Sequence, residues 1–232
     1  MQRRRGMIDP SQTVASLVLD HSECAAVLQR HRIDYCCHGD VPLADACRDR
    51  RLDVGVVVAE LEHAIGERAG DDPDPRALSS PALIQHILAH YHAPLRKTLP
   101  FLRMLAAKVA RVHGEHNPRL IELGEVVAQL AGTLEAHIDD EEATLFPAMT
   151  AGDRRDLSGV LTSTRDEHET VGGLLGRMRA ATTEYAVPDW ACNSYRTLYR
   201  ELERLETDVL RHVHLENHVL LPRFGSDARR RA

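Results

Sequence analysis

The clearest feature of the chain is a helical spacing of apolar residues that begins near residue 80. Four long segments place apolar residues three or four positions apart, and no stretch shows the alternation that predicts a series of strands. We expect helices over about 80–113, 118–146, 158–185 and 188–221. Because short polar connections join them, the pattern predicts an all-α fold built on an up-down-up-down four-helix bundle.

Prolines and a serine indicate where these helices begin, bend and end. Ser80 is expected to cap the first helix, and Pro94 and Pro100 are expected to kink it. Pro147 and Pro222 lie where the second and fourth helices should end.

A smaller helical unit is expected before the bundle, over residues 1–68. Its apolar pattern predicts short helices at about 11–19, 22–31, 43–50 and 53–68. Residues 69–80 are acidic, contain proline and have almost no large apolar side chains, which is typical of a linker. We therefore divide the chain into this unit, the linker, a bundle over 81–225 and a basic tail over 226–232.

Polar side chains interrupt the apolar stripe of each predicted bundle helix. The interruptions are His92, His137, Glu141, His168, His212 and Glu216. Two helices carry a histidine and a glutamate four residues apart, so that each pair shares one helix face. The other two helices carry one histidine each. Facing helices of a bundle would bring all six side chains to one internal point.

Buried carboxylates and imidazoles at such a point require a compensating partner. A metal-free bundle would have to satisfy each of the six groups independently, which is improbable in one layer. Four imidazoles and two carboxylates suit a pair of iron ions, with both carboxylates bridging and two imidazoles on each metal. This partition leaves open positions for a small ligand. Zinc usually closes a single tetrahedral site with four ligands, so six ligands favour two metals.

Several of the 14 histidines offer alternatives to this assignment. His86 and His90 form a pair four residues apart on a different flank of the first helix, and either could replace His92. His214 and His218 lie off the apolar stripe of the fourth helix, so we expect them to be exposed to solvent.

The composition of the chain limits which partners and which cellular compartment are expected. The chain has 29 basic and 35 acidic residues, and the resulting net charge of −6 disfavours nucleic acid binding. No apolar run is long enough for a membrane span or a secretory signal. Five cysteines without the spacing of a disulfide framework indicate reduced thiols. We therefore expect a cytoplasmic protein without nucleic acid or membrane partners, and a homodimer stays open.

The order of histidine and glutamate distinguishes two kinds of di-metal bundle. Ferritin-like sites place glutamate three residues before histidine, where this chain has Leu134 and Val209. Histidine followed one turn later by glutamate instead resembles the hemerythrin family. Two departures argue against simple reversible oxygen carriage: Gly172 stands where the third helix of hemerythrin would offer another histidine, and Glu216 stands where an aspartate would follow one residue later.

Two adjacent cysteines in the segment "IDYCCHGD" extend the resemblance to the small N-terminal unit. Together with the bundle they resemble the repair-of-iron-centres family, di-iron proteins for iron-sulfur clusters damaged by nitrosative or oxidative stress. The resemblance covers the chain from about Ser11 to Phe224. It implies that the six stripe residues bind two non-haem iron ions, joined by an oxo or hydroxo group, with Glu141 and Glu216 bridging.

Members of that family often carry further acids near the iron site, one of them a turn before the first histidine-glutamate pair. Here that position is Thr133, which casts doubt on a shared route for iron release or protons. Glu167, beside His168, can still supply such an acid and is a candidate functional residue.

The adjacent thiols of Cys36 and Cys37 cannot act as a C-x-x-C pair, because adjacent residues close only a strained disulfide ring. They are either redox-active or partner-facing thiols, or a buried pair in a tight turn. Cys24, Cys47 and Cys192 are expected to be packed as small apolar side chains.

The resemblance implies a role in restoring iron-sulfur clusters, either by supplying iron or by removing bound nitric oxide. The implied partners are nitric oxide, dioxygen and iron-sulfur client proteins. Two other functions stay open: a nitric oxide reductase, which would be an enzyme, and a hemerythrin-like sensor that binds oxygen or nitric oxide.

Overall fold

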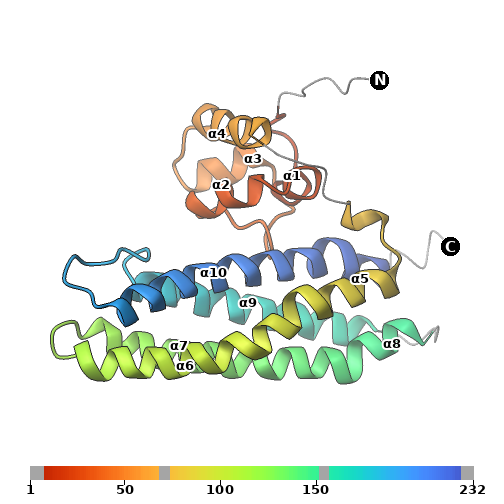
Figure 1. Ribbon diagram of the computed structural model, residues 1–232. Coiled ribbons are helices and arrows are strands. Elements are labelled where there is room, and N and C mark those ends of the chain that lie inside the picture. The colour runs from red at the N-terminus through yellow and green to blue at the C-terminus, as the bar shows by residue number, and fades with distance from the viewer. Residues whose placement is uncertain (1–7, 68–73, 152–156, 226–232) are drawn as a thin grey trace.

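The structure, a computed structural model, describes residues 8–67, 74–151 and 157–225. Within these ranges the regular elements are helices and no β-strand forms, so the predicted all-α fold is confirmed. Figure 1 shows long helices lying side by side, with a small unit of short helices above α10. The predicted basic tail, and residues 69–73 of the predicted linker, lie outside the described residues.

The N-terminal unit contains the four short helices that the pattern predicts. They are α1 (Val14–Asp20), α2 (Cys24–Arg30), α3 (Leu43–Asp49) and α4 (Val54–Gly66). Side chains cap two of them, because Thr13 accepts a hydrogen bond from the N–H of Ser16 and Asp53 accepts from two N–H groups of α4. Leu28, Leu43 and Leu61 are fully buried between the helices and form the centre of the unit.

The bundle follows after a short 3₁₀ turn, η1 (Pro75–Ala77). Its α-helices are α5 (Ser80–Ile87), α6 (Ala93–His113), α7 (Arg119–Asp140), α8 (Phe146–Thr150), α9 (Ser158–Ala181) and α10 (Asn193–Leu215). Helix α6 packs against α7 and α10, and α9 packs against the same two helices. The four long helices thus enclose one interior, as expected for a bundle with short connections.

Four predicted helix ends were wrong by one to a few residues. The second helix does not end before Pro147 but continues through α8 to Thr150, because a π-helical turn accommodates the proline. Ser79 rather than Ser80 caps α5, through a hydrogen bond from the N–H of Ala82. Helix α9 ends at Ala181, not near residue 185, because residues 183–185 all have positive φ angles of 52 to 60°, which an α-helix does not accept. The chain then needs several residues to turn, so α10 begins at Asn193 and not near residue 188.

Three π-helical turns interrupt the bundle helices, and each includes a predicted metal ligand. They are η2 (Leu88–His92), η3 (Glu141–Leu145) and η4 (Glu216–Leu220). In each case the residue before a proline donates its N–H to the carbonyl five residues earlier. Proline has no N–H and its ring clashes with the carbonyl four residues back, so a wider turn accommodates it. Pro94, one of the two predicted kink sites, comes just after the first of these turns, η2. Pro100, the other, lies within α6.

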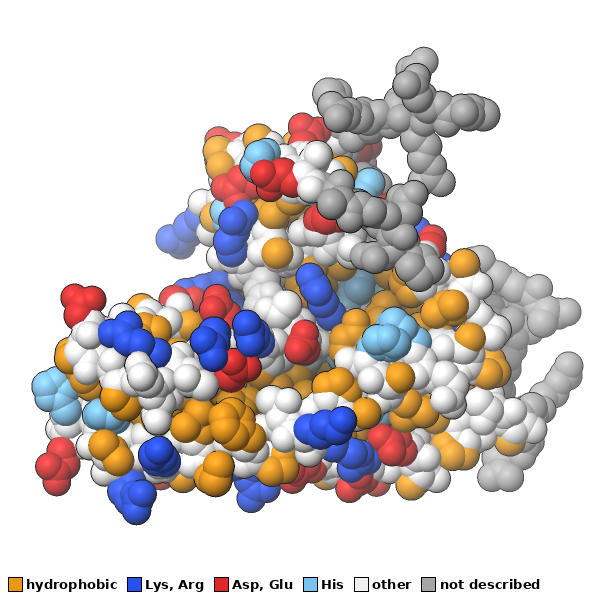
Figure 2. All heavy atoms as spheres, viewed as in Figure 1, with side chains coloured by type: hydrophobic (Ala, Val, Ile, Leu, Met, Phe, Trp, Pro, Cys, Tyr) orange, Lys and Arg blue, Asp and Glu red, His pale blue; other side chains and the backbone are white. Residues whose placement is uncertain are grey.

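One cluster of buried apolar residues continues from the N-terminal unit into the bundle. In Figure 2 the small unit rests directly on the bundle, and basic and acidic side chains are interspersed on the visible face. Among the helices of the described ranges, none is both long and apolar enough to cross a membrane.

Candidate metal centre

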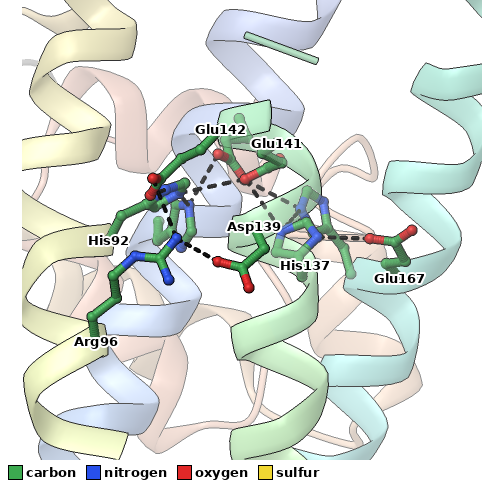
Figure 3. Close-up of polar contacts among 10 residues, drawn as sticks. His92, Arg96, His137, Asp139, Glu141, Glu142 and Glu167 are labelled. Carbon is green, nitrogen blue, oxygen red and sulfur yellow. Dashed lines mark hydrogen bonds and ion pairs between the residues drawn. The ribbon is translucent and has the colours of Figure 1, made fainter. Parts of the chain in front are cut away.

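The six stripe residues meet at one level inside the bundle. They come from α7, α9, α10 and the three π-helical turns, and none is more than 3% exposed. Figure 3 shows Glu141 between His92, which comes from a neighbouring helix, and His137, which lies one turn earlier on the helix that carries Glu141. The structure therefore brings together every residue of the predicted ligand set. Their role as ligands stays a prediction.

The six side chains form two groups of four that share both glutamates. The first subsite consists of His92, His212, Glu141 and Glu216, and the second subsite of His137, His168, Glu141 and Glu216. Within each group the candidate ligand atoms all lie within 4.8 Å of one another.

Both glutamates lie between the two subsites. Glu216 directs Oε1 to His212 Nε2 at 3.0 Å and Oε2 to His168 Nε2 at 3.2 Å. Glu141 Oε2 lies 3.4 Å from His92 Nε2 and 3.5 Å from His137 Nε2. Each carboxylate thus faces one histidine of each subsite.

Hydrogen bonds at the outer ring nitrogens indicate that the inner nitrogens are free to bind a cation. His137 Nδ1–H donates to Glu167 Oε2 at 2.8 Å, and His168 Nδ1–H donates to Asn217 Oδ1 at 2.9 Å. In a neutral imidazole the Nε2 atom then carries a lone pair. The two Nε2 atoms lie only 3.2 Å apart, so their lone pairs repel unless a proton or a metal ion lies between them. In the first subsite His92 Nε2 and His212 Nε2 are 3.1 Å apart, and His212 Nε2 also lies 3.0 Å from Glu216 Oε1.

The charges of the site also favour a cation. Burial alone would lower the pKa of His168, but its hydrogen bond to Glu216 and the charge of that carboxylate outweigh burial and raise the pKa to about 9. Burial would raise the pKa of Glu216, but His212 and His168 hold it well below its ordinary value. Glu141 Oε1 is buried without a hydrogen-bond partner. Two buried carboxyl groups together with imidazoles are a donor set suited to iron.

A second layer of side chains fixes the orientation of three of the four imidazoles. Glu142 accepts from His92 Nδ1–H at 3.0 Å, and Arg96 in turn forms ion pairs with Glu142 at 3.2 Å and with Asp139 at 2.6 Å. His212 differs, because its Nδ1 has no hydrogen-bond partner among the described residues. Such outer partners commonly fix the tautomer of a metal ligand and raise its basicity.

The second layer follows a repeated pattern in the sequence. The residue after each bridging glutamate, Glu142 or Asn217, orients a histidine of the adjacent helix. The residues before His92 and His168 each contact the other histidine of the same subsite. Glu167 hydrogen-bonds to His137, and the Tyr91 ring stacks on His212 with 5.5 Å between the ring centroids. Sequence reasoning singled out Glu167 but missed the other three, although their positions beside a ligand were a usable signal.

The remaining histidines separate clearly from the centre. His86 and His90 stack on each other at 4.3 Å outside the ligand groups, which places His92 alone in the position they could have replaced. The predicted exposure of His214 and His218 was wrong. His214 is buried and His218 is half-buried, because the N-terminal unit covers this side of α10 and η4.

The segment over residues 34–38, here called the cysteine segment, is a compact turn built around Asp34. The Oδ1 atom of Asp34 accepts hydrogen bonds from the N–H groups of Cys36 and Cys37 at 3.0 and 2.9 Å. Gly39 closes the turn, because a Cβ there would lie 2.5 Å from the carbonyl oxygen of Tyr35.

The two thiols of the cysteine segment differ in access. Their sulfur atoms are 3.6 Å apart and form no disulfide bond. Cys36 is buried, whereas Cys37 is half-buried. Contact with Cys37 and burial raise the pKa of the Cys36 thiol. A cavity of about 340 Å³ lies between this segment and α9, with Cys37 and Gly172 in its lining.

The cysteine segment docks on α10 and η4, which carry two of the six predicted ligands. His214 Nδ1–H donates to the carbonyl oxygen of Tyr35 at 2.9 Å. Asn217 and His218 both donate to the carbonyl oxygen of Cys36, at 2.9 and 3.0 Å. The loop between α2 and α3 that carries these carbonyls reaches down to α10 in Figure 1.

The other cysteines agree only in part with the expectation that they are packed. Cys24 and Cys47 are buried, and burial raises the pKa of Cys24 to about 12. Cys192 is exposed, so that expectation was wrong for it. It caps α10 at the end of the bundle, where its sulfur lies 3.2 Å from His113 Nε2.

Both parts of the chain match known protein families. Residues 83–224 match the Hemerythrin HHE cation binding domain, and residues 10–65 match a domain described as Domain of Unknown function (DUF542). The ligand groups lie within the first match, which is a domain that binds non-haem iron. The exact domain boundaries proposed from the sequence stay a prediction.

Two relatives illustrate how much of the chain is shared. The Iron-sulfur cluster repair protein ScdA of Staphylococcus haemolyticus (strain JCSC1435) is 33% identical over 223 residues, which are 94% of this chain and 100% of the relative. The Iron-sulfur cluster repair protein YtfE of Yersinia pseudotuberculosis serotype IB (strain PB1/+) is 31% identical over 214 residues, or 92% of this chain and 96% of the relative. The chain thus belongs to the hemerythrin HHE cation binding domain family and, along nearly its whole length, to the family of iron-sulfur cluster repair proteins.

Proposed function

We propose that this chain repairs damaged iron-sulfur clusters by means of two non-haem iron ions held in the two subsites. The observation that carries the proposal is the sharing of Glu141 and Glu216 between two groups that each contain two further histidines. Four imidazoles and two bridging carboxylates provide for two ions in one buried site. The relatives that share this architecture along nearly the whole chain are named as cluster repair proteins.

The chain's own groups would hold and orient the ions. Iron, when bound, supplies redox chemistry and open coordination positions for a small ligand such as nitric oxide or dioxygen. Glu142, Glu167 and Asn217 keep three Nδ1 atoms protonated and turn the matching Nε2 atoms inward. The apolar bundle around the site limits the access of water.

The cysteine segment gives the proposal its second part. Cys37 is the accessible thiol of the pair and borders a cavity, so it is the thiol we expect to meet iron, nitric oxide or a thiol of an iron-sulfur client protein. The five cysteines are all free, which supports the cytoplasmic location expected from the sequence.

Metal content per chain, combined with an optical spectrum of untagged protein, tests the centre. We expect two irons and an absorption from an oxo or hydroxo bridge, both lost in a His137→Ala, His212→Ala variant. The matched control is His86→Ala, His90→Ala, which removes two histidines outside the subsites. One zinc, or no metal, would contradict the proposal.

Repair activity separates the proposed function from its rivals. A client enzyme whose iron-sulfur cluster has been damaged with nitric oxide should regain activity with the loaded protein and not with the His137→Ala, His212→Ala variant. Nitrous oxide in the headspace would instead identify a nitric oxide reductase. Reversible gas binding without an effect on the client would identify a sensor. If a Cys36→Ser, Cys37→Ser variant repairs as well as the unmodified chain, the thiols have no part in the function.

A further inference from the structure

Asn217 stands between the metal centre and the cysteine segment. Its side-chain oxygen accepts from His168 Nδ1–H at 2.9 Å, and its NH₂ group donates to the carbonyl oxygen of Cys36 at 2.9 Å. Both partners fix the direction of the amide, because a ring N–H requires an acceptor and a carbonyl requires a donor. One half-buried side chain therefore links a residue of the second subsite to the N-terminal unit.

The equivalent position in the other half of the centre has no such link. There Glu142 accepts from His92 Nδ1–H, and its other contact is an ion pair with Arg96 of the same bundle. A carboxylate has no hydrogen to donate, so it could not hold a carbonyl as Asn217 does. The amide of Asn217 thus makes a hydrogen bond to the N-terminal unit that Glu142 does not make.

Hydrogen bonds in series strengthen one another. A cation on His168 Nε2 withdraws electron density from the ring, which makes Nδ1–H a stronger donor to Asn217. The polarised amide then donates more strongly to the carbonyl oxygen of Cys36. Binding of the metal should therefore tighten the docking of the cysteine segment.

We propose that Asn217 couples metal occupancy at His168 to the docking of the cysteine segment on the bundle. The coupling is reciprocal: docking of the segment raises the metal affinity of the second subsite by the same factor. This inference rests on the proposed metal site. It makes Asn217 a positioning residue that connects the two functional parts of the chain.

Two other contacts allow docking and coupling to be separated. His214 donates to the carbonyl oxygen of Tyr35, and His218 donates to that of Cys36. These contacts hold the segment when Asn217 is replaced. His218 is therefore a matched control: it shares the carbonyl of Cys36 with Asn217 but, in the part of the chain that the structure describes, forms no hydrogen bond, ion pair or ring contact with His168.

Amide hydrogen exchange of residues 34–38, measured in the full chain without metal and after anaerobic addition of ferrous iron, tests the coupling. We expect iron to slow exchange about fivefold or more, which is the lower end of typical couplings between sites. In Asn217→Leu, which loses both bonds, and in Asn217→Asp, which keeps the acceptor and loses the donor, bound iron should no longer slow exchange. In His218→Ala, exchange should be faster without metal yet still slow on addition of iron.

A Cys36→Ser, Cys37→Ser variant excludes direct binding of iron by the thiols, and it should show the same slowing as the unmodified chain. A chelator competition gives the reciprocal readout: His214→Ala, His218→Ala, which weakens docking and leaves the partner of His168 in place, should release one iron about fivefold more readily and keep the other. If the unmodified chain binds two irons and exchange is unchanged, the coupling is wrong while the proposed function stands. Full slowing in both Asn217 variants also overturns it. Absence of iron binding would overturn the coupling together with the proposed function.

Discussion

The two subsites have the same ligand types and share both glutamates, yet their surroundings differ. In the second subsite each histidine has a hydrogen-bond partner at Nδ1: Glu167 for His137 and Asn217 for His168. In the first subsite, Glu142 orients His92, but His212 Nδ1 has no hydrogen-bond partner among the described residues and its ring stacks on Tyr91. The second subsite also connects to the cysteine segment, through Asn217. The ligand set alone makes the subsites equal, and the second layer distinguishes them.

The largest expected effect comes from the groups that the subsites share. Because Glu216 belongs to both ligand groups, Glu216→Ala should remove both irons, whereas His212→Ala should weaken the first subsite only. Loss of the carboxylate also leaves His168 and His212 without their anionic partner. Metal analysis of the purified variants, with iron counted per chain, measures the difference.

Glu142→Ala is the matched control for this experiment, because it removes a neighbouring carboxylate that orients His92 but belongs to neither ligand group. It should lower affinity at one subsite and leave the other iron bound. Loss of one iron in Glu216→Ala and of the second only in the double variant with Glu141→Ala would contradict the bridging role.

The next largest effect should appear in the order of metal release. Removal of an outer-layer partner typically costs 10–100-fold in metal affinity. His212 lacks a partner for its Nδ1, so the first subsite should release iron to a chelator about 10–100-fold more readily than the second. His92→Ala, which leaves the second subsite intact, and His168→Ala, which leaves the first, allow each affinity to be measured separately.

Glu167→Ala sharpens the same comparison. It removes the partner of His137 and should bring the affinity of the second subsite close to that of the first. Equal affinities in His92→Ala and His168→Ala would show that the outer hydrogen bonds do not distinguish the subsites.

Acid should weaken the turn of the cysteine segment. Burial alone would raise the pKa of Asp34, but hydrogen bonds from His38, Cys37 and Cys36 outweigh burial and lower the pKa below its ordinary 3.8. A lowered pKa means that the stability from this carboxylate is present above pH 3.8 and is lost as the pH falls through the lowered value. Exchange of the two cysteine amides, compared with intrinsic rates, should therefore accelerate below about pH 4.

The same turn should show a weaker change on the alkaline side. The hydrogen bond to Asp34 raises the pKa of His38, so its contribution is present below the ordinary 6.5 and is lost as the pH rises through the raised value. His38 is largely exposed and also faces Glu169, so solvent screens this effect. In Asp34→Asn both steps should disappear. A step at acid pH that survives in this variant would assign it to another group.

Helical periodicity explains why so much of the centre could be predicted. A side chain on the apolar stripe of a long helix must face the interior, so positions such as His137 and Glu141 follow from spacing alone. The three π-helical turns do not disturb this argument, because the ligands stay at their boundaries. The all-α fold and the short helices of the N-terminal unit follow from the same pattern.

Contacts between distant parts of the chain could not be predicted in this way. His214 and His218 lie off the stripe, and their partners are carbonyl groups about 180 residues earlier. Backbone carbonyls leave no signature in the sequence. The exposure of Cys192 likewise depends on where α10 begins, and the run of positive φ angles that delays this start has no proline or glycine to mark it.

The smallest effect should come from a glycine of α9. Gly173 lies within α9, one turn beyond His168, and a Cβ there would meet no atom within 4 Å. Because glycine in a helix costs about 0.5–1 kcal/mol relative to alanine, Gly173→Ala should raise the free energy of unfolding by about that amount. Iron content and the order of release should stay unchanged.

Gly39→Ala is the opposite case, because its Cβ would clash with the carbonyl oxygen of Tyr35 at 2.5 Å and the side chain of Ala15 at 2.7 Å. Denaturant unfolding should show stabilisation in the first variant and destabilisation in the second, and if Gly39→Ala also accelerates exchange of residues 34–38, the tight turn itself, and not only its docking on α10, holds the thiols in place.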